Sequence, residues 1–390
     1  MISKEYPPEI YGGAGVHVAE LVAALRESID VTVRAFGAPR EEEGTFAYRT
    51  PTGLAGANPA LQTLGTDLEI VAAIGGADLV HSHTWYANFA GHLASQLHGI
   101  PHVLTAHSLE PLRPWKAEQL GGGYAVSSGI EKLAYENAAA VVAVSAGMRA
   151  DILRSYPGVD PARVRVIHNG IDVERWRPVE DAAFLESIGM DPARPSVVFV
   201  GRITRQKGLP YLLQAARLLP PEVQLVLCAG APDTPEIMAE VQEGVRLLQQ
   251  TREGVIWIER MLPRDELSAI LAAATTFVCP SVYEPLGIVN LEAMACGAAV
   301  VGTATGGIPE VVDDGVTGRL VPIEQVQDGT GTPIDPERFV ADLAAVLTEV
   351  ATDPERARAY GEAGRERART QFSWTAIAEA TRALYAELIL

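Results

Sequence analysis

The fold of this chain is decided by residues 197–209, which read Val-Val-Phe-Val-Gly-Arg-Ile-Thr-Arg-Gln-Lys-Gly-Leu. Residues 197–200 form a short, continuously apolar run, which is typical of a strand covered on both faces of a parallel sheet. The next residues predict a turn into a helix, with Arg202, Arg205 and Lys207 at the carboxyl end of the strand. Ligands bind at that end of the strands in open parallel sheets. A solvated basic cluster that only caps loops is the alternative.

The same alternation of short apolar runs and longer helical patterns extends through the chain in both directions. It predicts parallel, doubly wound α/β sheets, and so many strands favour two Rossmann-like domains over a single sheet. A boundary is expected near residues 169–178. Residues 1–3 are short for a central strand, which leaves open whether that strand begins upstream. The other expected strands are 31–36, 79–82, 103–106, 141–144, 164–167, 197–200, 225–228, 256–258, 277–279, 300–302 and 319–321.

The composition is that of an ordinary globular protein, with 48% hydrophobic and 21% charged residues in a chain of 390. The charge is acidic, because 31 Lys and Arg stand against 49 Asp and Glu and give −18. Nucleic acid is therefore not expected as a partner, since phosphate binding needs a basic face. No apolar run is long enough for a transmembrane segment, and no signal peptide is recognisable. Three scattered cysteines without a Cys-x-x-Cys pair indicate reduced thiols in a cytoplasmic protein.

Two glycine-rich turns precede expected helices, where backbone N–H groups can bind a phosphate. The first is Tyr-Gly-Gly at residues 11–13, before a helix whose apolar positions recur with helical spacing. The second is Gly-Gly at residues 306–307, directly after an expected strand. The first turn matches neither GxGxxG nor a lysine-containing phosphate loop, and an ordinary tight turn is its alternative.

Two carboxylates stand eight residues apart, Glu284 before an expected helix and Glu292 on it. The helix is apolar on nearly every side and is therefore expected to be buried. A buried carboxylate is costly unless it is paired or hydrogen-bonded. Sugar hydroxyls are suitable partners, because an ionised carboxylate only accepts hydrogen bonds and hydroxyls donate them. A buried ion pair with an arginine is the alternative.

Histidines stand at the ends of two expected strands. His81 and His83 share one face by the strand period, which would suit a metal pair, but no third ligand is evident at a useful spacing. No Asp-x-Asp occurs anywhere, so the usual acidic ligand for a magnesium diphosphate is missing. We therefore expect no metal site. We expect His107 to contact a substrate, and a strand-end histidine satisfied within the fold is the alternative.

Together these motifs resemble glycosyltransferase family 4, and the similarity covers nearly the whole chain. The resemblance implies the α/β GT-B fold, in which two Rossmann-like domains with parallel sheets face each other across a cleft. The last helix then crosses back near Ser373. We expect an N-terminal, acceptor-side domain of residues 1–170 plus 373–390, and a nucleotide-sugar-binding domain of residues 171–372. The matching segments are residues 6–17, 81–85, 168–172, 201–208, 284–292, 306–312 and 372–374.

The resemblance also assigns roles to residues at the matching positions. Arg202 and Lys207 correspond to the basic pair that neutralises the diphosphate leaving group. Glu284 corresponds to a carboxylate on the transferred glucose, and His107 to a histidine that touches that glucose. The other expected donor contacts are Glu292 at the ribose, the backbone of Leu286, Gly287, Gly12 and Gly13, the hinge residue Asn169, and Gly306 and Gly307. His83 and Tyr11 are expected to bind the acceptor.

The function implied is a retaining transfer of glucose from a nucleoside diphosphate, with ADP-glucose preferred, to an α-1,4-glucan or to glucose 1-phosphate. The nucleotide sugar is a substrate, and neither a cofactor nor a metal is expected. Residues 105–111 and the chain opening resemble the short actinobacterial glycogen synthases, some of which use glucose 1-phosphate. Longer bacterial glycogen synthases carry Lys-x-Gly-Gly, whereas residues 11–13 lack that lysine. Either the acceptor differs, or an arginine from elsewhere replaces it.

Other functions remain open at this point. A family 4 transferase with another small-molecule or lipid acceptor would carry the same motifs, and a homodimer is compatible with either. A nucleotide-sugar epimerase on the same scaffold would turn over without an acceptor. A phosphorylase would need a lysine for pyridoxal phosphate and a longer chain. A solute-binding protein is normally exported and has no need for a basic diphosphate site.

Overall fold

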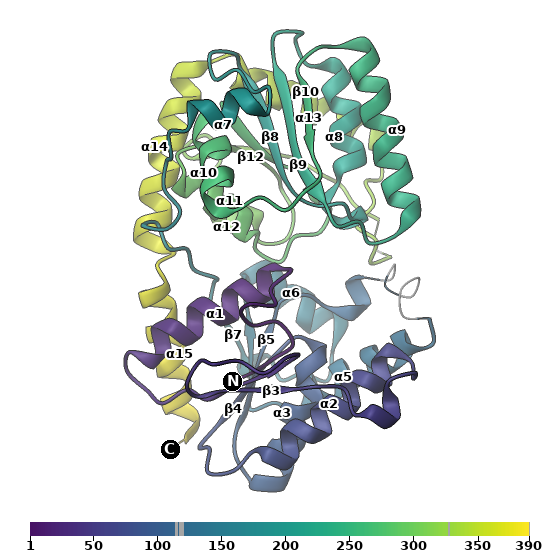
Figure 1. Cartoon of the computed structure of the whole chain (residues 1–390), viewed down its shortest axis with the longest axis vertical. Helices are drawn as coiled ribbons and strands as arrows, with labels where there is room; N and C mark the ends of the chain where they lie inside the picture. Colours follow the sequence, from purple (N-terminus) through teal and green to yellow (C-terminus); the bar gives the residue numbers. More distant parts are fainter. Residues whose placement is uncertain (114–115, 117–120, 327, 390) are drawn as a thin grey trace. The chain divides into compact units, whose positions relative to one another are not determined.

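The computed structural model describes residues 1–113, 116, 121–326 and 328–389 and divides the chain into two compact units (Figure 1). Unit 1 comprises Met1–Gly170 and Trp374–Leu390, and unit 2 comprises Ile171–Ser373. Each unit contains its own parallel sheet, which confirms the expected α/β class with two Rossmann-like sheets. The division of roles between an acceptor-side and a donor-side domain stays a prediction. Residue 390 of the expected returning segment lies outside the described residues.

In the described part of unit 1, seven parallel strands are ordered β3-β2-β1-β4-β5-β6-β7. The order reverses between β1 and β4, and such a switch point opens a crevice at the carboxyl ends of the strands. The strands are β1 Ile2–Ser3, β2 Val33–Phe36, β3 Thr45–Tyr48, β4 Val80–His83, β5 His102–Ala106, β6 Ala140–Ala143 and β7 Val164–Val166.

Strand β3 is absent from the strands expected from the sequence. It is a four-residue edge strand that pairs only with β2, and it follows the glutamates at 41–43. Its Phe46 is 51% exposed. An edge strand with one solvated face lacks the continuous apolar run that marks the central strands.

The last helix, α15 (Trp374–Ile389), packs against α1 (Gly13–Arg26) within unit 1 (Figure 1). A Cβ on Gly170 would lie 2.6 Å from the Trp374 ring, so a glycine is required where the chain leaves this unit. The remaining described helices of unit 1 are α2 Pro59–Ala73, α3 Trp85–His98, α5 Gly123–Asn137 and α6 Ala146–Ser155.

The sheet of unit 2 has its own switch point, between β8 and β11, in the order β10-β9-β8-β11-β12-β13. All of its pairings are parallel. The first strand, β8, therefore has its carboxyl end next to that of β11, which places their following loops side by side. The strands are β8 Ser196–Arg202, β9 Gln224–Gly230, β10 Val255–Ile258, β11 Thr276–Cys279, β12 Ala299–Thr303 and β13 Gly318–Val321.

The core of unit 2 forms where apolar residues of the sheet meet helices on its faces, with Phe199, Leu227 and Leu343 among the buried members. Among the described residues, no helix is both long and apolar enough to cross a membrane. The helices are α7 Ala182–Ser187, α8 Leu209–Ala215, α9 Pro235–Thr251, α10 Arg264–Ala273, α11 Ile288–Ala295, α12 Ile308–Val311, α13 Pro336–Ala351 and α14 Pro354–Gln371.

Candidate active site

An ion pair between Lys207 and Glu284 stands at the switch point of unit 2. Lys207 ends the short 3-10 turn Arg205–Lys207 after β8, and Glu284 lies in the loop after β11. Lys207 Nζ donates to Glu284 Oε2 at 2.7 Å, and Ser281 Oγ donates to the same oxygen at 3.0 Å. The two predicted site residues are therefore in contact at the edge where parallel sheets bind ligands.

The Lys207 side chain keeps its positive charge at neutral pH. Burial by itself lowers the Lys207 pKa, but the negative charge and hydrogen bond of Glu284 outweigh it, and the net pKa is raised. The side chain of Lys207 is 20% exposed and that of Glu284 is 7% exposed. A cation held this way can bind a phosphate oxygen strongly, because little water competes for it.

Arg202 is the last residue of β8 and lies near Lys207. The positive charge of Arg202 lowers the pKa of Lys207. Its guanidinium forms an ion pair with Asp233, whose side chain is nearly buried. The two basic residues predicted for the diphosphate are thus neighbours, and each already has a carboxylate partner.

The predicted glycine turn 306–307 is built onto the Glu284 backbone. Gly307 N–H donates to the Glu284 carbonyl oxygen at 2.9 Å. Gly306 has φ +55°, and a Cβ there would lie 1.9 Å from the same oxygen. This turn was expected to offer its N–H groups to a phosphate, but the Gly307 N–H is used within the protein. Gly306 and Gly307 therefore position Glu284 in this structure.

Helix α11 carries Glu292 and begins at the predicted contact Gly287, which has φ +90° and follows the buried Leu286. The Glu292 carboxylate forms no hydrogen bond or ion pair within the described part of the chain. Burial raises its pKa to about 7, and the Lys207 charge only partly opposes this. A partly buried carboxylate without a partner is suited to accept hydrogen bonds from hydroxyl groups.

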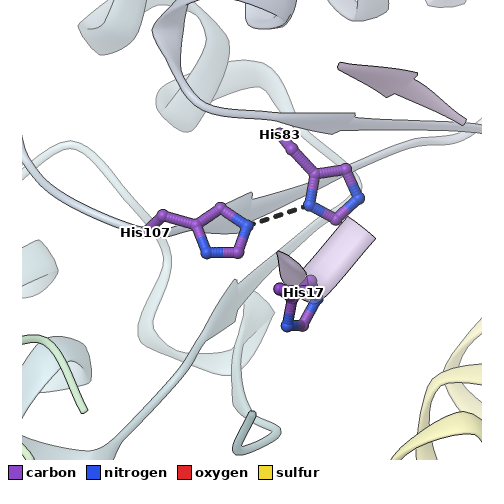
Figure 2. A group of neighbouring side chains, drawn as sticks. All are labelled: His17, His83 and His107. Atoms are coloured by element: carbon purple, nitrogen blue, oxygen red, sulfur yellow. Dashed lines mark hydrogen bonds between the residues drawn. The ribbon is translucent and has the colours of Figure 1, made fainter. Parts of the chain in front are cut away.

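In unit 1, three histidines from separate elements meet beside the sheet (Figure 2). His83 ends β4, His107 follows β5, and His17 lies on α1. His83 Nδ1 and His107 Nε2 share a hydrogen bond of 3.0 Å, and the His17 ring meets the His107 ring edge-on with centroids 4.8 Å apart. His81 stacks on the other face of this group, 4.4 Å from the His83 ring.

These histidines are neutral at pH 7. Burial lowers the His17 pKa to about 4, and contact with the Asn169 amide only partly opposes it. Burial also holds the pKa values of His83 and His107 well below the usual range. Neutral imidazoles need no counter-ion, and one donor and one acceptor nitrogen allow His83 and His107 to share their hydrogen bond. The two ring nitrogens of His17 are buried without a hydrogen-bond partner among the described residues.

The same three histidines are the one described cluster of His, Cys, Asp and Glu side chains that could hold a metal, with ligand atoms within 4.8 Å of one another. The spacing of the histidines along the chain did not reveal it. The His83–His107 hydrogen bond uses one nitrogen of each ring, however. Two nitrogens bound to one zinc ion at ~2.1 Å can be at most ~4.2 Å apart. The rings would have to rotate and break that hydrogen bond before binding a metal.

The remaining predicted residues of unit 1 differ in whether their polar groups are accessible to a ligand. Glu5 Oε2 accepts hydrogen bonds from the Tyr11 and Gly12 N–H groups, at 3.1 and 2.8 Å. The Gly12 N–H, which we expected to donate to a ligand, is therefore occupied, while Gly13 begins α1. His83 was expected to bind the acceptor, but it is completely buried. Its Nδ1 shares a hydrogen bond with His107. The Tyr11 side chain is 49% exposed.

Several contacting residues were not predicted from the sequence. His17 could have been found, because it lies four residues before Leu21 on the buried stripe of α1. A histidine on an apolar helix face needs polar neighbours. Asp233 carries no local signal, since its partner Arg202 ends a different strand. Ser281 and Glu5 bond within their own loops, but loop positions have no periodicity that would mark these contacts.

The chain matches known proteins along its whole length. The model of Glycosyltransferase Family 4 matches residues 11–175, and that of Glycosyl transferases group 1 matches residues 194–349. Alpha-maltose-1-phosphate synthase of Mycolicibacterium smegmatis is 58% identical over 388 residues, which are 99% of this chain and 98% of that protein.

Solved structures agree with the fold of both units. Sucrose-phosphate synthase from Thermosynechococcus elongatus is 26% identical, with a TM-score of 0.78, and covers 99% of this chain and 98% of its own. Anabaena HepE in complex with UDP-glucose is 19% identical, with a TM-score of 0.76, and covers 99% of each chain. These similarities confirm the expected GT-B fold class.

Proposed function

Since the chain belongs to glycosyltransferase family 4, we propose that it transfers glucose from a nucleoside diphosphate to glucose 1-phosphate, in α-glucan synthesis. The similarity to alpha-maltose-1-phosphate synthase over 99% of the chain supports this reaction. Maltose 1-phosphate differs from glucose 1-phosphate by one glucosyl residue, so the acceptor follows from the product that this relative is named for. ADP-glucose is the donor that the family resemblance favours.

The observation that carries the proposal is the Lys207–Glu284 ion pair at the switch point of unit 2. When the donor binds, its diphosphate forms ion pairs with Lys207 and Arg202 in place of their carboxylate partners. The Glu284 carboxylate then accepts hydrogen bonds from glucose hydroxyls. The two cations then stabilise the negative charge that develops on the leaving group. Positive side chains would thereby do the work that a metal ion does in other transferases.

The unpartnered Glu292 supports a donor with a ribose. Its carboxylate lies on the same helix that begins at Gly287, beside the loop that holds Glu284. Two adjacent ribose hydroxyls can both donate to one carboxylate, which would replace the water that this group loses on burial.

We infer a retaining mechanism in which the diphosphate itself acts as the base. The bond from the anomeric carbon to the diphosphate oxygen breaks, and a bond to the acceptor oxygen forms on the same face. The acceptor's proton passes to the departing phosphate oxygen. Only one carboxylate, Glu284, is placed on the transferred glucose, so the nucleophile and acid pair of a retaining glycosidase is not assigned.

The test is a matrix of donors and acceptors with the purified chain. ADP-glucose and UDP-glucose are each incubated with glucose 1-phosphate, maltose, glycogen or no acceptor, and nucleoside diphosphate release is measured. Glucose 1-phosphate should give the fastest release, and NMR should show a new α-linkage. Conversion of the nucleotide sugar without any acceptor would instead identify an epimerase and end the proposal.

A further inference from the structure

A cavity of about 380 Å³ lies in unit 1, outside the histidine cluster and the unit 2 site. This volume falls within the ~300–1,000 Å³ that is typical of small-molecule sites. We propose that the cavity binds a sugar-phosphate acceptor, with Lys4 and Arg49 holding the phosphate. This inference rests on the proposed transferase function and names the residues that would select its acceptor. The lining residues used in the argument are Lys4, Glu9, Tyr11, Tyr48, Arg49 and Thr50.

The cavity lies at the ligand-binding edge of the unit 1 sheet. Lys4 directly follows β1, and Arg49 directly follows β3. His107 follows β5 in the same way, and all of these strands are parallel. The carboxyl ends of parallel strands share one edge of the sheet, so Lys4, Arg49 and His107 all lie along that edge.

The strand spacing between Lys4 and His107 along that edge is comparable to the length of a single hexose phosphate. Strand β1 is separated from β5 by β4 alone, which is a distance of ~10 Å for two strand spacings. In glucose 1-phosphate, the phosphate on C1 and the hydroxyl on C4 stand at opposite ends of the ring. A phosphate held by Lys4 and Arg49 therefore directs the C4 hydroxyl toward His107.

Lys4 and Arg49 lack the carboxylate partners that most basic side chains of this protein have. Neither forms a salt bridge within the part of the chain that the structure describes. Lys4 Nζ lies 3.8 Å from the centre of the Tyr86 ring. Burial and the neighbouring Lys116 lower the Lys4 pKa, and the Glu5 carboxylate only partly opposes them. An arriving dianion would oppose the repulsion from Lys116 and would give both side chains an ionic partner.

The other polar groups of the cavity suit a sugar rather than a second anion. Glu9 Oε2 lies 3.8 Å from an Arg40 nitrogen on the rim, which partly offsets its charge. Arg34 donates to the Tyr48 hydroxyl, which leaves the hydroxyl proton free to donate to a ligand. A neutral glucan end would use these hydroxyl contacts but would leave Lys4 and Arg49 without an anionic partner.

Direct binding tests this inference without a donor. Calorimetry with glucose 1-phosphate should show affinity about 10-fold weaker for Lys4→Met and for Arg49→Met, and about 100-fold weaker for the double variant. Binding of glucose 1-phosphate to the double variant at wild-type affinity would overturn the inference. Arg382→Met is the matched control, because Arg382 is an exposed arginine of unit 1 on α15. It should bind as the wild type does.

Steady-state kinetics separates this inference from the proposed function. The double variant should raise KM for glucose 1-phosphate about 100-fold, while KM for the nucleotide sugar and turnover with maltose stay within 2-fold. If the wild-type chain transfers glucose to glucose 1-phosphate but the variants keep its KM, only the phosphate site is wrong. If the wild type transfers glucose to no acceptor, the proposed function fails, and calorimetry alone then decides whether the cavity binds sugar phosphates.

Discussion

Lys207 Nζ lies 2.7 Å from Glu284 Oε2, and this contact joins two loops whose residues are 77 positions apart in the chain. Both side chains are largely buried, so each neutralises a charge that is only partly accessible to water. The pair therefore has two roles that can be separated by experiment. It stabilises the fold of unit 2, and in our proposal it exchanges partners when the donor binds.

Replacing either residue should nearly abolish transfer. We expect Lys207→Met and Glu284→Gln each to lower kcat/KM at least ~100-fold, the scale of losing one preorganised contact in a dry site. Lys207→Met should also lower the melting temperature, since it leaves a buried carboxylate without its partner. The double variant should regain much of that thermal stability and remain inactive. A double variant that recovers activity would show that the pair is only structural.

Arg205 provides the matched control for that experiment. It lies on the same 3-10 turn as Lys207, but it is exposed and its nearest carboxylate, on Glu240, is 3.9 Å away. Arg205→Met should change kcat/KM less than ~3-fold, because a solvated side chain contributes little.

A side chain that displaces the Glu284 backbone should reduce activity, although the Glu284 carboxylate itself is unchanged. In Gly306→Ala, the new Cβ would clash with the Glu284 carbonyl oxygen, only 1.9 Å away. We expect kcat/KM to fall more than ~10-fold, since sub-ångström displacement of a site residue is costly. Gly315→Ala is the control, because Gly315 also has positive φ but nothing lies within 4 Å of its Cβ position. Equal kinetic effects in both variants would attribute the loss to backbone strain instead.

Donor affinity should rise with pH around neutrality. The pKa of Glu292 is raised to about 7, so the side chain is partly protonated there. Ribose hydroxyls donate to the ionised form, so binding is strongest above this pKa and weakens as pH falls through 7. Titrations with the nucleoside diphosphate at pH 6 and 8 should differ about 10-fold in dissociation constant. Glu292→Gln should bind weakly at both pH values, and a persisting pH dependence would assign the titration to another group.

Removal of metals should leave the reaction intact. We expect EDTA to change the initial rate less than ~2-fold, because Lys207 and Arg202 supply the positive charge at the leaving group. The rate is measured after dialysis against the chelator and again after Mg²⁺ or Zn²⁺ is added back. Loss of activity that either ion restores would contradict the proposed role of the two basic side chains.

Acid should destabilise unit 1 before it protonates the surface carboxylates. Burial lowers the His17 pKa from 6.5 to about 4, so the unfolded chain binds a proton in this range and the folded chain does not. Stability is therefore complete above pH 6.5 and declines as pH falls to 4, by about 3 kcal/mol for this one residue. Urea unfolding at pH 7.5, 6 and 5 measures the decline.

The test compares how steeply the free energy of unfolding falls with pH in two histidine variants. His17→Gln should flatten it, while His98→Gln, at an exposed position that ends α3, should leave it unchanged. An unchanged slope in His17→Gln would place the acid-sensitive groups elsewhere.

Local sequence patterns predicted the parts of this protein that depend on local chemistry. The apolar run at 197–200 predicted strand β8, and the basic cluster after it predicted that Arg202 and Lys207 stand at a strand end. Strand β3 was missed, because an edge strand is only half covered. Glycine at 306 predicted a turn, but the pattern could not show that the turn packs on Glu284.

The amino-acid sequence by itself determined the α/β class, the series of strands and the kinds of residue that end them, since these follow from periodicity over a few neighbouring positions. Only the tertiary structure decided which strand ends meet, because the order of strands in a sheet depends on packing between distant segments. It paired Lys207 with Glu284 and Arg202 with Asp233, and it brought His17 to His107. It also placed Lys4 and Arg49 in the lining of one cavity, although no spacing along the chain connects them.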